Sequence, residues 1–384
     1  MKTRLKDLMP RAGISSLLSS LMAIAVGLLV GFIILLVSNP AQAVDGFKAI
    51  LVGGFVDKKN LGQVLYFATP IILTGLSVGF ANKTGLFNIG ASGQFIAGAY
   101  AAVFVGVKFV FLPPSIHWVV ALLAALLAGA IWGLLPGLLK AYYNVNEVIS
   151  CIMMNYIGMY MVNFLVVRTI FDSLKNQSKR IAVSAIIPKL GMEKFFKTGA
   201  SSSSANAGIL IAIIAGIIIY IILEKTKFGF ELKACGYNRD ASRYAGINER
   251  KSIISSMMIA GALAGLGGAL LYLAGSGKGI EVVDVLAIEG FNGIAVALLG
   301  LNNPLGIILA GLFVAHLNVG GFNMQLYNFV PQVIEIIIAV IIYFSAFALL
   351  LKGLISILWK KSDEENANAE LVKEDKADKG GLQS

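Results

Sequence analysis

The sequence is poor in the residues that usually carry catalysis, metal binding or disulfides. Among 384 residues there are two cysteines, Cys151 and Cys235, and two histidines. We predict one cysteine in an apolar span and the other in a polar loop, which argues against a disulfide, and their spacing is not that of metal ligands. The chain has no Walker A run G-x-x-x-x-G-K-[ST], no paired carboxylates and no nucleophile beside a base. The sequence therefore predicts neither an enzyme nor a metal or cofactor site.

Charge is scarce as well. Charged residues make up 14% of the chain, whereas hydrophobic residues make up 57% and the mean hydropathy is +0.81. This apolar surface exceeds what one soluble core of such length could bury, so lipid must solvate much of it. The net charge is +10, but Lys and Arg cluster just outside the apolar runs, where anionic headgroups account for them. Nucleic-acid binding needs a basic stripe with interleaved aromatic residues, and none is present.

Long apolar runs predict an all-α, polytopic membrane protein of about ten transmembrane helices. The runs cover residues 17–37, 61–81, 89–107, 117–139, 148–167, 209–223, 253–273, 287–301, 305–317 and 333–351. Most are long enough to cross the hydrocarbon core, and two in the second half are shorter. Lys and Arg are more frequent in the loops on the side of both termini, so the positive-inside rule places both termini in the cytoplasm.

The ends of the chain are interpreted from their composition. Residues 1–16 are expected to form a basic cytoplasmic N-terminus ahead of a transmembrane domain at 17–356. The first run is expected to stay as an anchor; the alternative is cleavage near Ala41-Gln42-Ala43, which is similar to a signal-peptidase site. Residues 357–384 contain almost no large apolar side chain and are expected to be a disordered cytoplasmic tail.

Two polar, glycine-rich segments interrupt the apolar pattern, one in each half of the chain. The first covers residues 82–94 and the second covers residues 289–306. Irregular backbone at membrane depth is tolerated where protein or a water-filled cavity satisfies its polar groups, so paired interruptions of this kind indicate a translocation path. The alternative is that both are ordinary short loops whose glycines allow close helix packing.

The polar segment 231–250 predicts a short helix between two membrane spans. Asn238 suits the N-cap, residues 239–245 would form two turns, and Gly246 suits the left-handed position after the C-cap. Small side chains at Ala241 and Ala245 allow close approach by a partner, and two arginines four residues apart share a face. The helix could dock on a partner protein, or it could lie at the membrane surface held by lipid headgroups.

Several runs together resemble one transporter family. They are FNIGASGQ at 87–94, VNEVI at 145–149 with MNY at 154–156, the segment 236–248, and GIAVALLG at 293–300 followed by NPLG at 303–306. In this order they are similar to the nucleoside and simple-sugar permeases of the branched-chain amino acid/ribose permease superfamily. The resemblance covers roughly residues 61–351, and it implies two pseudo-repeated halves around a central route.

The resemblance also implies partners and a direction of transport. The chain would be the channel-forming permease of an ABC importer in the cell membrane, with a cytoplasmic ATPase, a second permease of the same or a similar kind, and an extracytoplasmic solute-binding lipoprotein. ATP would be hydrolysed by the separate ATPase subunit. The coupling segment that docks on this ATPase would lie within 231–250 and use Gly236, Asn238, Arg239, Ala241, Arg243, Ala245 and Gly246.

The side chains expected along the substrate route are uncharged. They are Asn82, Phe87, Asn88, Gln94, Asn155, Phe291 and Asn292. Amides can bond the edges of a neutral ring and the phenyl groups can stack on its face. An ionised solute would call for a buried counter-charge, which is costly inside a membrane, and the acidic candidates lie close to predicted span ends. We therefore expect a neutral polar solute, with nucleosides first and simple sugars second.

A proton- or sodium-coupled secondary transporter is the main alternative. It would need acidic residues at mid-depth and no docking helix, which is the reverse of what the sequence contains. His316 is the histidine that a proton relay would use. A single histidine without an acidic partner nearby is better explained as a packed residue with one backbone hydrogen bond.

Overall fold

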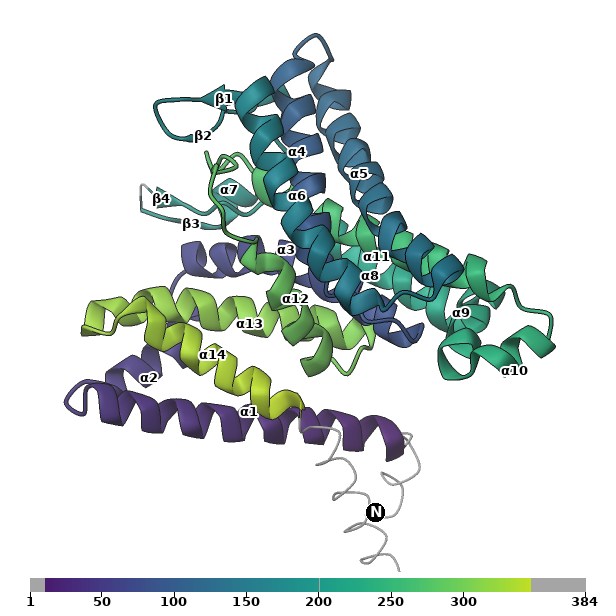
Figure 1. Ribbon diagram of the computed structural model, residues 1–384. Helices are drawn as coiled ribbons and strands as arrows, with labels where there is room; N and C mark the ends of the chain where they lie inside the picture. Colours follow the sequence, from purple (N-terminus) through teal and green to yellow (C-terminus); the bar gives the residue numbers. More distant parts are fainter. Residues whose placement is uncertain (1–10, 200, 347–384) are drawn as a thin grey trace, which may run out of the picture.

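The computed structural model describes residues 11–199 and 201–346. The predictions for residues 1–10, for the end of the last span and of the transmembrane domain at 347–356, and for the tail at 357–384 lie outside these described residues. Within them the chain is mainly α-helical (Figure 1), and its strands are four two-residue pieces. The predicted all-α class is therefore confirmed.

Each of the ten predicted spans coincides with one α-helix. These helices are α1 (Arg11–Ser38), α3 (Lys58–Lys83), α4 (Ala91–Lys108), α5 (Pro114–Tyr143), α6 (Glu147–Thr169), α8 (Gly208–Lys225), α11 (Glu249–Tyr272), α12 (Ile288–Leu299), α13 (Pro304–Met324) and α14 (Pro331–Ala346). Within the described residues, 6 helices are long and apolar enough to cross a membrane, namely α3, α5, α6, α8, α11 and α13. A polytopic membrane protein follows from their number and length.

Short elements connect these helices. They are α2 (Ala43–Val52), η1 (Gly53–Phe55), η2 (Val183–Ala185), α7 (Met192–Phe195), α9 (Lys227–Tyr237), α10 (Arg239–Tyr244) and η3 (Gln325–Tyr327). Strands β1 (Phe171–Asp172) and β2 (Gln177–Ser178) form one antiparallel hairpin, and β3 (Lys197–Thr198) and β4 (Ser201–Ser202) form another. The registers pair Phe171 with Ser178 and Lys197 with Ser202.

Helices α5 and α11 cross at the centre of the fold through glycines. A Cβ atom on Gly129 of α5 would collide with the carbonyl oxygen of Gly261 on α11, and one on Gly133 would lie 3.2 Å from the Cα of Gly261. A Cβ atom on Gly98 of α4 would likewise collide with the backbone of Gly265 on α11. Small residues spaced four apart let helix backbones approach closely, and this spacing occurs on both α5 and α11. The glycines thus set the distance between the central helices.

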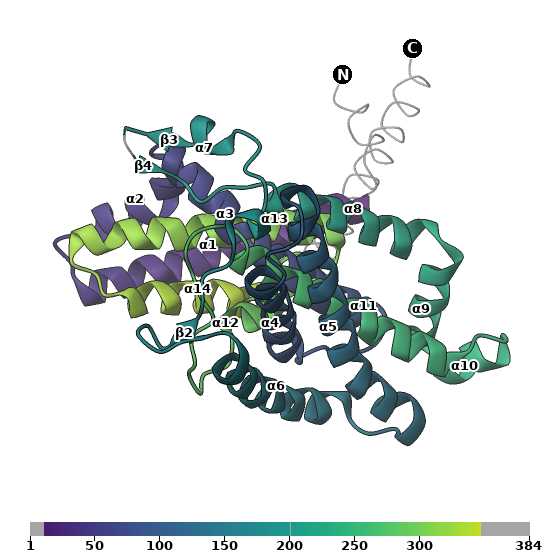
Figure 2. The same ribbon diagram turned by 90° about the horizontal axis from the view of Figure 1, so that it is seen from above.

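The helices form two groups that differ in direction. In Figure 1, α4, α5 and α6 rise together, whereas α1, α2, α13 and α14 lie across the lower part of the molecule. Figure 2 shows α9 and α10 projecting away from the bundle beyond the end of α11. We call the end of the bundle that carries α9, α10 and the α3–α4 turn the α10 end, and the end with the strands the strand end.

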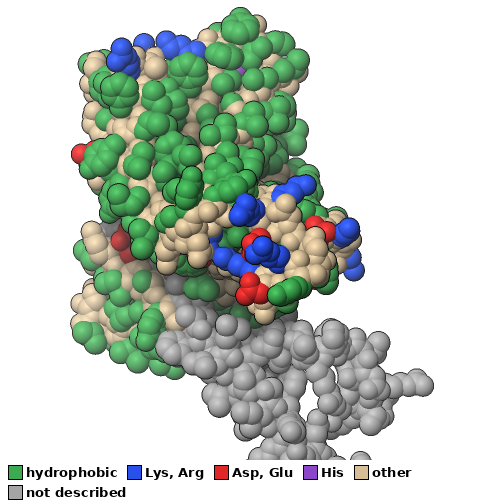
Figure 3. All heavy atoms as spheres, turned by 45° about the vertical axis from the view of Figure 1, so that its right-hand side comes forward, with side chains coloured by type: hydrophobic (Ala, Val, Ile, Leu, Met, Phe, Trp, Pro, Cys, Tyr) green, Lys and Arg blue, Asp and Glu red, His purple; other side chains and the backbone are tan. Residues whose placement is uncertain are grey.

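The surface agrees with a lipid environment. Hydrophobic side chains cover the body of the molecule in Figure 3, while charged side chains gather at the top edge and on the projecting region of α9 and α10. Along α5 an exposed residue recurs every four positions, at Leu123, Leu127, Ile131, Leu135 and Leu139. A purely aliphatic exposed stripe of this kind is suited to lipid tails.

Candidate functional site

The first glycine-rich segment forms a polar bend between α3 and α4 that is buried in the bundle. Asn88 is 0% exposed, and its amide forms a reciprocal pair with Gln94: Asn88 Nδ2 donates to Gln94 Oε1 at 2.8 Å and Gln94 Nε2 donates to Asn88 Oδ1 at 3.0 Å. Asn88 Nδ2 also donates to Ser77 Oγ at 3.0 Å. In this conformation the two amides satisfy each other, as buried polar groups must.

Asn155 of α6 holds the same bend from the other side. Its Oδ1 accepts from the Gly93 amide at 2.8 Å, and its Nδ2 donates to the Ile89 carbonyl at 3.0 Å. Asn155 is 1% exposed. A side-chain amide that bonds both to a helix N-terminus and to the preceding loop replaces the partners that irregular backbone lacks. The bend therefore lies in protein, as irregular backbone in a membrane requires.

The second glycine-rich segment meets the first, although they are about two hundred residues apart. Gly290 of α12 packs so closely on Ser92 of α4 that a Cβ atom would collide with its backbone. Ser92 Oγ donates to the Ala287 carbonyl at 2.9 Å, and a Cβ on Gly293 would lie 2.6 Å from the carbonyl carbon of Thr74 in α3. The two interruptions seen in the sequence thus form one contiguous region.

The remaining predicted route residues lie around this region and are more exposed than Asn88, Gln94 and Asn155. Asn82, at the end of α3, donates through Nδ2 to Asn302 Oδ1 at 3.0 Å, which joins the first segment to the α12–α13 turn. Phe87 and Asn292 are half-buried, and Phe291 is 37% exposed. The structure places Asn88, Gln94 and Asn155 inside the bend and leaves the other four near its surface. Contact of any of these seven side chains with a solute stays a prediction.

The predicted short helix is present as α10. Asn238 Oδ1 accepts from the Ala241 amide at 3.0 Å, which is an N-cap bond, and Gly246 has a φ of 80° after the helix. The helix ends at Tyr244, one residue earlier than predicted. Sequence reasoning missed two tyrosines here: Tyr237, the last residue of α9, is 89% exposed, and Tyr244, the last residue of α10, is 94% exposed. Two aromatic residues flanking a charged polar helix were a signal that could have been used.

The α10 region contacts the polar bend directly. Gly236, at the end of α9, packs on Gly85 of the α3–α4 turn, where a Cβ on Gly236 would lie 2.6 Å from the Thr84 carbonyl carbon. Thr84 Oγ1 in turn hydrogen-bonds Ser256 Oγ of α11. Nearby, Lys140 and Glu147 form a salt bridge of 2.8 Å across the α5–α6 turn. The end of α9, directly before α10, is therefore in backbone contact with the bend.

The residues considered for other chemistry have structural partners. His316 Nε2 lies 2.8 Å from the Leu51 carbonyl oxygen, and its ring packs on Gly54. This confirms the interpretation of a packed histidine with one backbone bond. Within the described residues, no group of three His, Cys, Asp or Glu could hold a metal ion.

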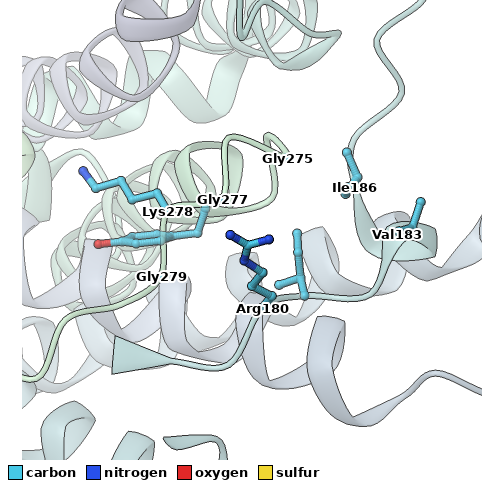
Figure 4. Close-up of a pocket in the computed structure, with 9 residues that line it drawn as sticks. Arg180, Val183, Ile186, Gly275, Gly277, Lys278 and Gly279 are labelled. Carbon is cyan, nitrogen blue, oxygen red and sulfur yellow. The ribbon is translucent and has the colours of Figure 1, made fainter. Parts of the chain in front are cut away.

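One pocket lies at the strand end, away from the bend. It has a volume of about 180 Å³ and is lined by Arg180, Lys278 and the glycines of the turn at 275–279, among others. Figure 4 shows the Arg180 side chain directed toward this turn. Lys278 Nζ lies 3.4 Å from Glu289 Oε1 at the start of α12. The pocket is thus basic and separate from the amide cluster.

The bundle of apolar helices around a buried polar bend defines a multi-pass membrane protein. The chain belongs to the family of branched-chain amino acid transport system permease components, which it matches over residues 60–346. The resemblance inferred from the sequence motifs is thereby confirmed.

Three curated relatives show the range of this similarity. The chain is 41% identical to a guanosine ABC transporter permease of Bacillus subtilis, over 91% of this chain and 98% of the relative. It is 37% identical to a nucleoside ABC transporter permease of Lactococcus lactis, over 85% and 89% of the two chains. It is 34% identical to a glucose ABC transporter permease of Haloferax volcanii, over 84% and 85%. No solved structure matches the chain.

Proposed function

We propose that this protein is the membrane-spanning permease subunit of an ABC importer that carries nucleosides across the cell membrane. The observation that carries the proposal is the backbone contact between Gly236 and Gly85, because it joins an exposed helix to the polar bend. A permease driven by a separate ATPase needs such a connection between its docking surface and its solute route. The nucleoside assignment is supported by the two relatives that are guanosine and nucleoside permeases.

In this proposal α10 lies in the cytoplasm and docks on the ATPase. Tyr237 and Tyr244 offer large exposed aromatic surfaces, and Arg239 and Arg243 offer positive charge beside them. Aromatic and arginine side chains are the residues that most often dominate protein interfaces. ATP hydrolysis takes place on that partner, and the permease itself performs no catalysis. The strand end then faces outward, toward a solute-binding lipoprotein, and both termini are cytoplasmic.

The solute is proposed to pass beside the region where the two glycine-rich segments meet. Asn82, Phe87, Phe291 and Asn292 are the candidates for direct contact because they retain exposure. The buried amides Asn88, Gln94 and Asn155 are proposed to come into contact when the bend moves. A glucose permease among the relatives makes a simple sugar the second candidate solute.

Reconstitution tests the function and the solute together. The permease is co-purified with its ATPase and partner permease, placed in proteoliposomes with ATP inside and the binding protein outside, and assayed with labelled guanosine, ribose and leucine. We expect ATP-dependent uptake of guanosine that excess unlabelled nucleoside abolishes. Uptake of ribose in preference to guanosine would transfer the assignment to sugars. Uptake driven by an ion gradient without an ATPase would refute the ABC mechanism.

A further inference from the structure

One stripe of α6 differs from the lipid-facing surfaces of the other helices. Tyr156 is 48% exposed and Tyr160 is 56% exposed, and they flank the midpoint of α6. Asn163 continues the stripe, since residues three and four apart share one helix face. The exposed positions beside these tyrosines on α6 are apolar, namely Ile152, Met153, Ile157, Met161 and Phe164, and on α8 the exposed positions between the helix ends are aliphatic throughout. Tyrosine is enriched at membrane interfaces, so two exposed tyrosines at mid-depth are unlike a lipid-facing surface.

A non-helical segment runs beside this stripe. Residues 281–287 are non-helical and lead from the turn after α11 to the start of α12. Figure 1 shows this green segment descending toward α12. Asn163 Nδ2 donates to the Val283 carbonyl at 2.9 Å and lies 3.3 Å from Asp284 Oδ1. Val285 is 72% exposed, and Asp284 is exposed as well. The carbonyls of Val282 and Val283 accept from the side chains of Asn176 and Asn163, whereas the backbone groups of the described residues 284–286 have no hydrogen-bond partner in the chain.

The segment reaches the middle of the bundle. Its last residue, Ala287, accepts a hydrogen bond from Ser92, and the next residue of α4, Gly93, is bonded to Asn155 of α6. Asn155 lies fourteen residues before the end of α6 at Thr169, which corresponds to about 21 Å at 1.5 Å per residue. Because α6 crosses the membrane, Ala287 lies well within the hydrocarbon core, whereas Asp284, beside Asn163, lies only six residues or about 9 Å before the end of α6.

We infer that the face formed by Tyr156, Tyr160 and the segment 281–287 is the wall of a water-filled solute route. Unpaired backbone and an exposed carboxylate cannot face lipid tails, because each unsatisfied group costs several kcal/mol there. Non-helical backbone at this depth occurs where it lines an aqueous cavity or is covered by protein. This inference rests on the proposed transport function and extends it to Tyr160 and the segment 281–287, which lie outside the sequence motifs, and to Tyr156, which was not among the predicted route residues.

The chemistry of the wall fits a neutral solute with a flat ring and hydrogen-bond donors. The two tyrosine rings lie one helical turn apart and offer stacking surfaces with hydroxyl groups. Asp284 offers carboxylate oxygens that accept from ring N–H groups or from sugar hydroxyls. A nucleoside has both a ring and such donors. The first turn of α12, with Phe291 and Asn292, continues the same wall below Ala287.

Thiol accessibility tests the inference on the assembled transporter in nanodiscs. Single cysteines replace Tyr160 and Val285, and the matched control is Leu127→Cys on α5, where the native side chain is 64% exposed. Both native cysteines are buried, so the unmodified protein supplies the background. A charged, membrane-impermeant maleimide is the probe, because thiolates form and react in water. We expect Y160C and V285C to react at least about tenfold faster than L127C.

The possible outcomes test the aqueous wall and the identity of the solute separately. Slowing of Y160C labelling by guanosine supports both the wall and the nucleoside assignment. Rapid labelling that ribose slows and guanosine does not would keep the wall and overturn the proposed solute. Rapid labelling that no solute slows would overturn solute contact at Tyr160. Labelling of Y160C and V285C as slow as that of L127C would overturn the aqueous wall itself.

Discussion

Gly85 and Gly236 touch through their backbones: a Cβ atom placed on Gly85 would lie 2.5 Å from the Cα of Gly236. One belongs to the turn that starts the polar bend, and the other is the penultimate residue of α9, directly before α10, which we propose docks on the ATPase. Gly85 also has a φ of 74°, which L side chains rarely adopt. The contact leaves no room for a side chain, so any displacement of α9 toward the bend must displace the bend as well.

The first prediction concerns this contact. Gly236→Val should separate α9 from the bend, so that nucleoside uptake falls by at least about tenfold while ATP hydrolysis by the complex continues, because a steric clash of this size forces backbone shifts. Uptake and ATPase rate are measured on the same proteoliposomes. Equal loss of both activities would mean that Gly236 is needed for assembly and does not transmit movement.

Gly85 allows a matched comparison. Gly85→Ala introduces both a strained φ and a clash, whereas Gly191→Ala introduces a strained φ of 80° with nothing within 4 Å. Left-handed backbone costs a non-glycine residue roughly 1–2 kcal/mol. We expect Gly191→Ala to lose only about this much stability and to keep transport, and Gly85→Ala, which adds the clash with Gly236, to lose more stability and to lose transport. If Gly191→Ala lowers uptake equally, strain rather than contact explains the effect.

The second prediction concerns the exposed tyrosine of the docking helix. Tyr244→Ser should weaken co-purification of the ATPase and lower uptake without changing the thermal unfolding of the permease, because an aromatic anchor at an interface contributes about 2 kcal/mol or more. Leu174→Ser is the control: Leu174 is 95% exposed, close to the 94% of Tyr244, but lies at the strand end. Retention of the ATPase by Tyr244→Ser would place the docking surface elsewhere.

A bulky residue at position 246, directly after α10, tests the same proposed docking surface. Gly246 has a φ of 80°, and a Cβ atom placed on it would have no atom within 4 Å beyond its chain neighbours. Gly246→Trp should therefore insert into the membrane normally yet lose coupled uptake when the partner is present. Membrane content is measured by immunoblot, and uptake in cells. Full uptake by this variant would refute close docking at this position.

The third prediction concerns the amide pair in the bend. Asn88→Leu leaves the buried Gln94 amide without its partner, which costs about 1–3 kcal/mol. The thermal midpoint of the purified permease should fall accordingly. The double variant Asn88→Leu/Gln94→Leu is the control, since removing both polar groups should cost less than the sum of the single changes. Additive losses would show that the two amides do not stabilise each other.

The fourth prediction concerns the central helix crossing. Gly261→Val places a branched side chain against the Gly129 carbonyl oxygen of α5, and overpacking of this kind costs about 1–3 kcal/mol or more. The protein should be recovered in lower amount and unfold at lower temperature. Leu127→Val, at an exposed position of α5, is the control and should leave both quantities nearly unchanged. Normal recovery of the Gly261 variant would mean that α5 and α11 can separate without loss.

The helices and their capping were predictable because their causes are local. An apolar run of about twenty residues is visible in the sequence by itself, and each predicted run coincides with a helix. The α10 cap was predictable for the same reason, since Asn238 and Gly246 act on neighbouring backbone groups. The two-residue strands were not predicted, because so short a pairing depends on which loops meet at the strand end.

The site could be predicted in part. The sequence indicated both glycine-rich segments, but it treated the seven route residues as equivalent. The structure separates them, since Asn88 is 0% exposed and bonded to Gln94 while Phe291 is 37% exposed. Exposure and hydrogen bonding depend on neighbours far apart along the chain. The Tyr156 and Tyr160 stripe was missed because a tyrosine in an apolar run gives no sign of the direction it faces.

By itself the sequence determined the membrane environment, the positions of the helices and the family, because hydrophobicity, capping and motifs are properties of short stretches of chain. Only the tertiary structure decided which polar groups hydrogen-bond to one another and which remain exposed. The meeting of Gly85 with Gly236, and of Ser92 with Ala287 and Gly290, joins residues far apart in the sequence. Such contacts arise from the packing of whole helices, so no local pattern could specify them.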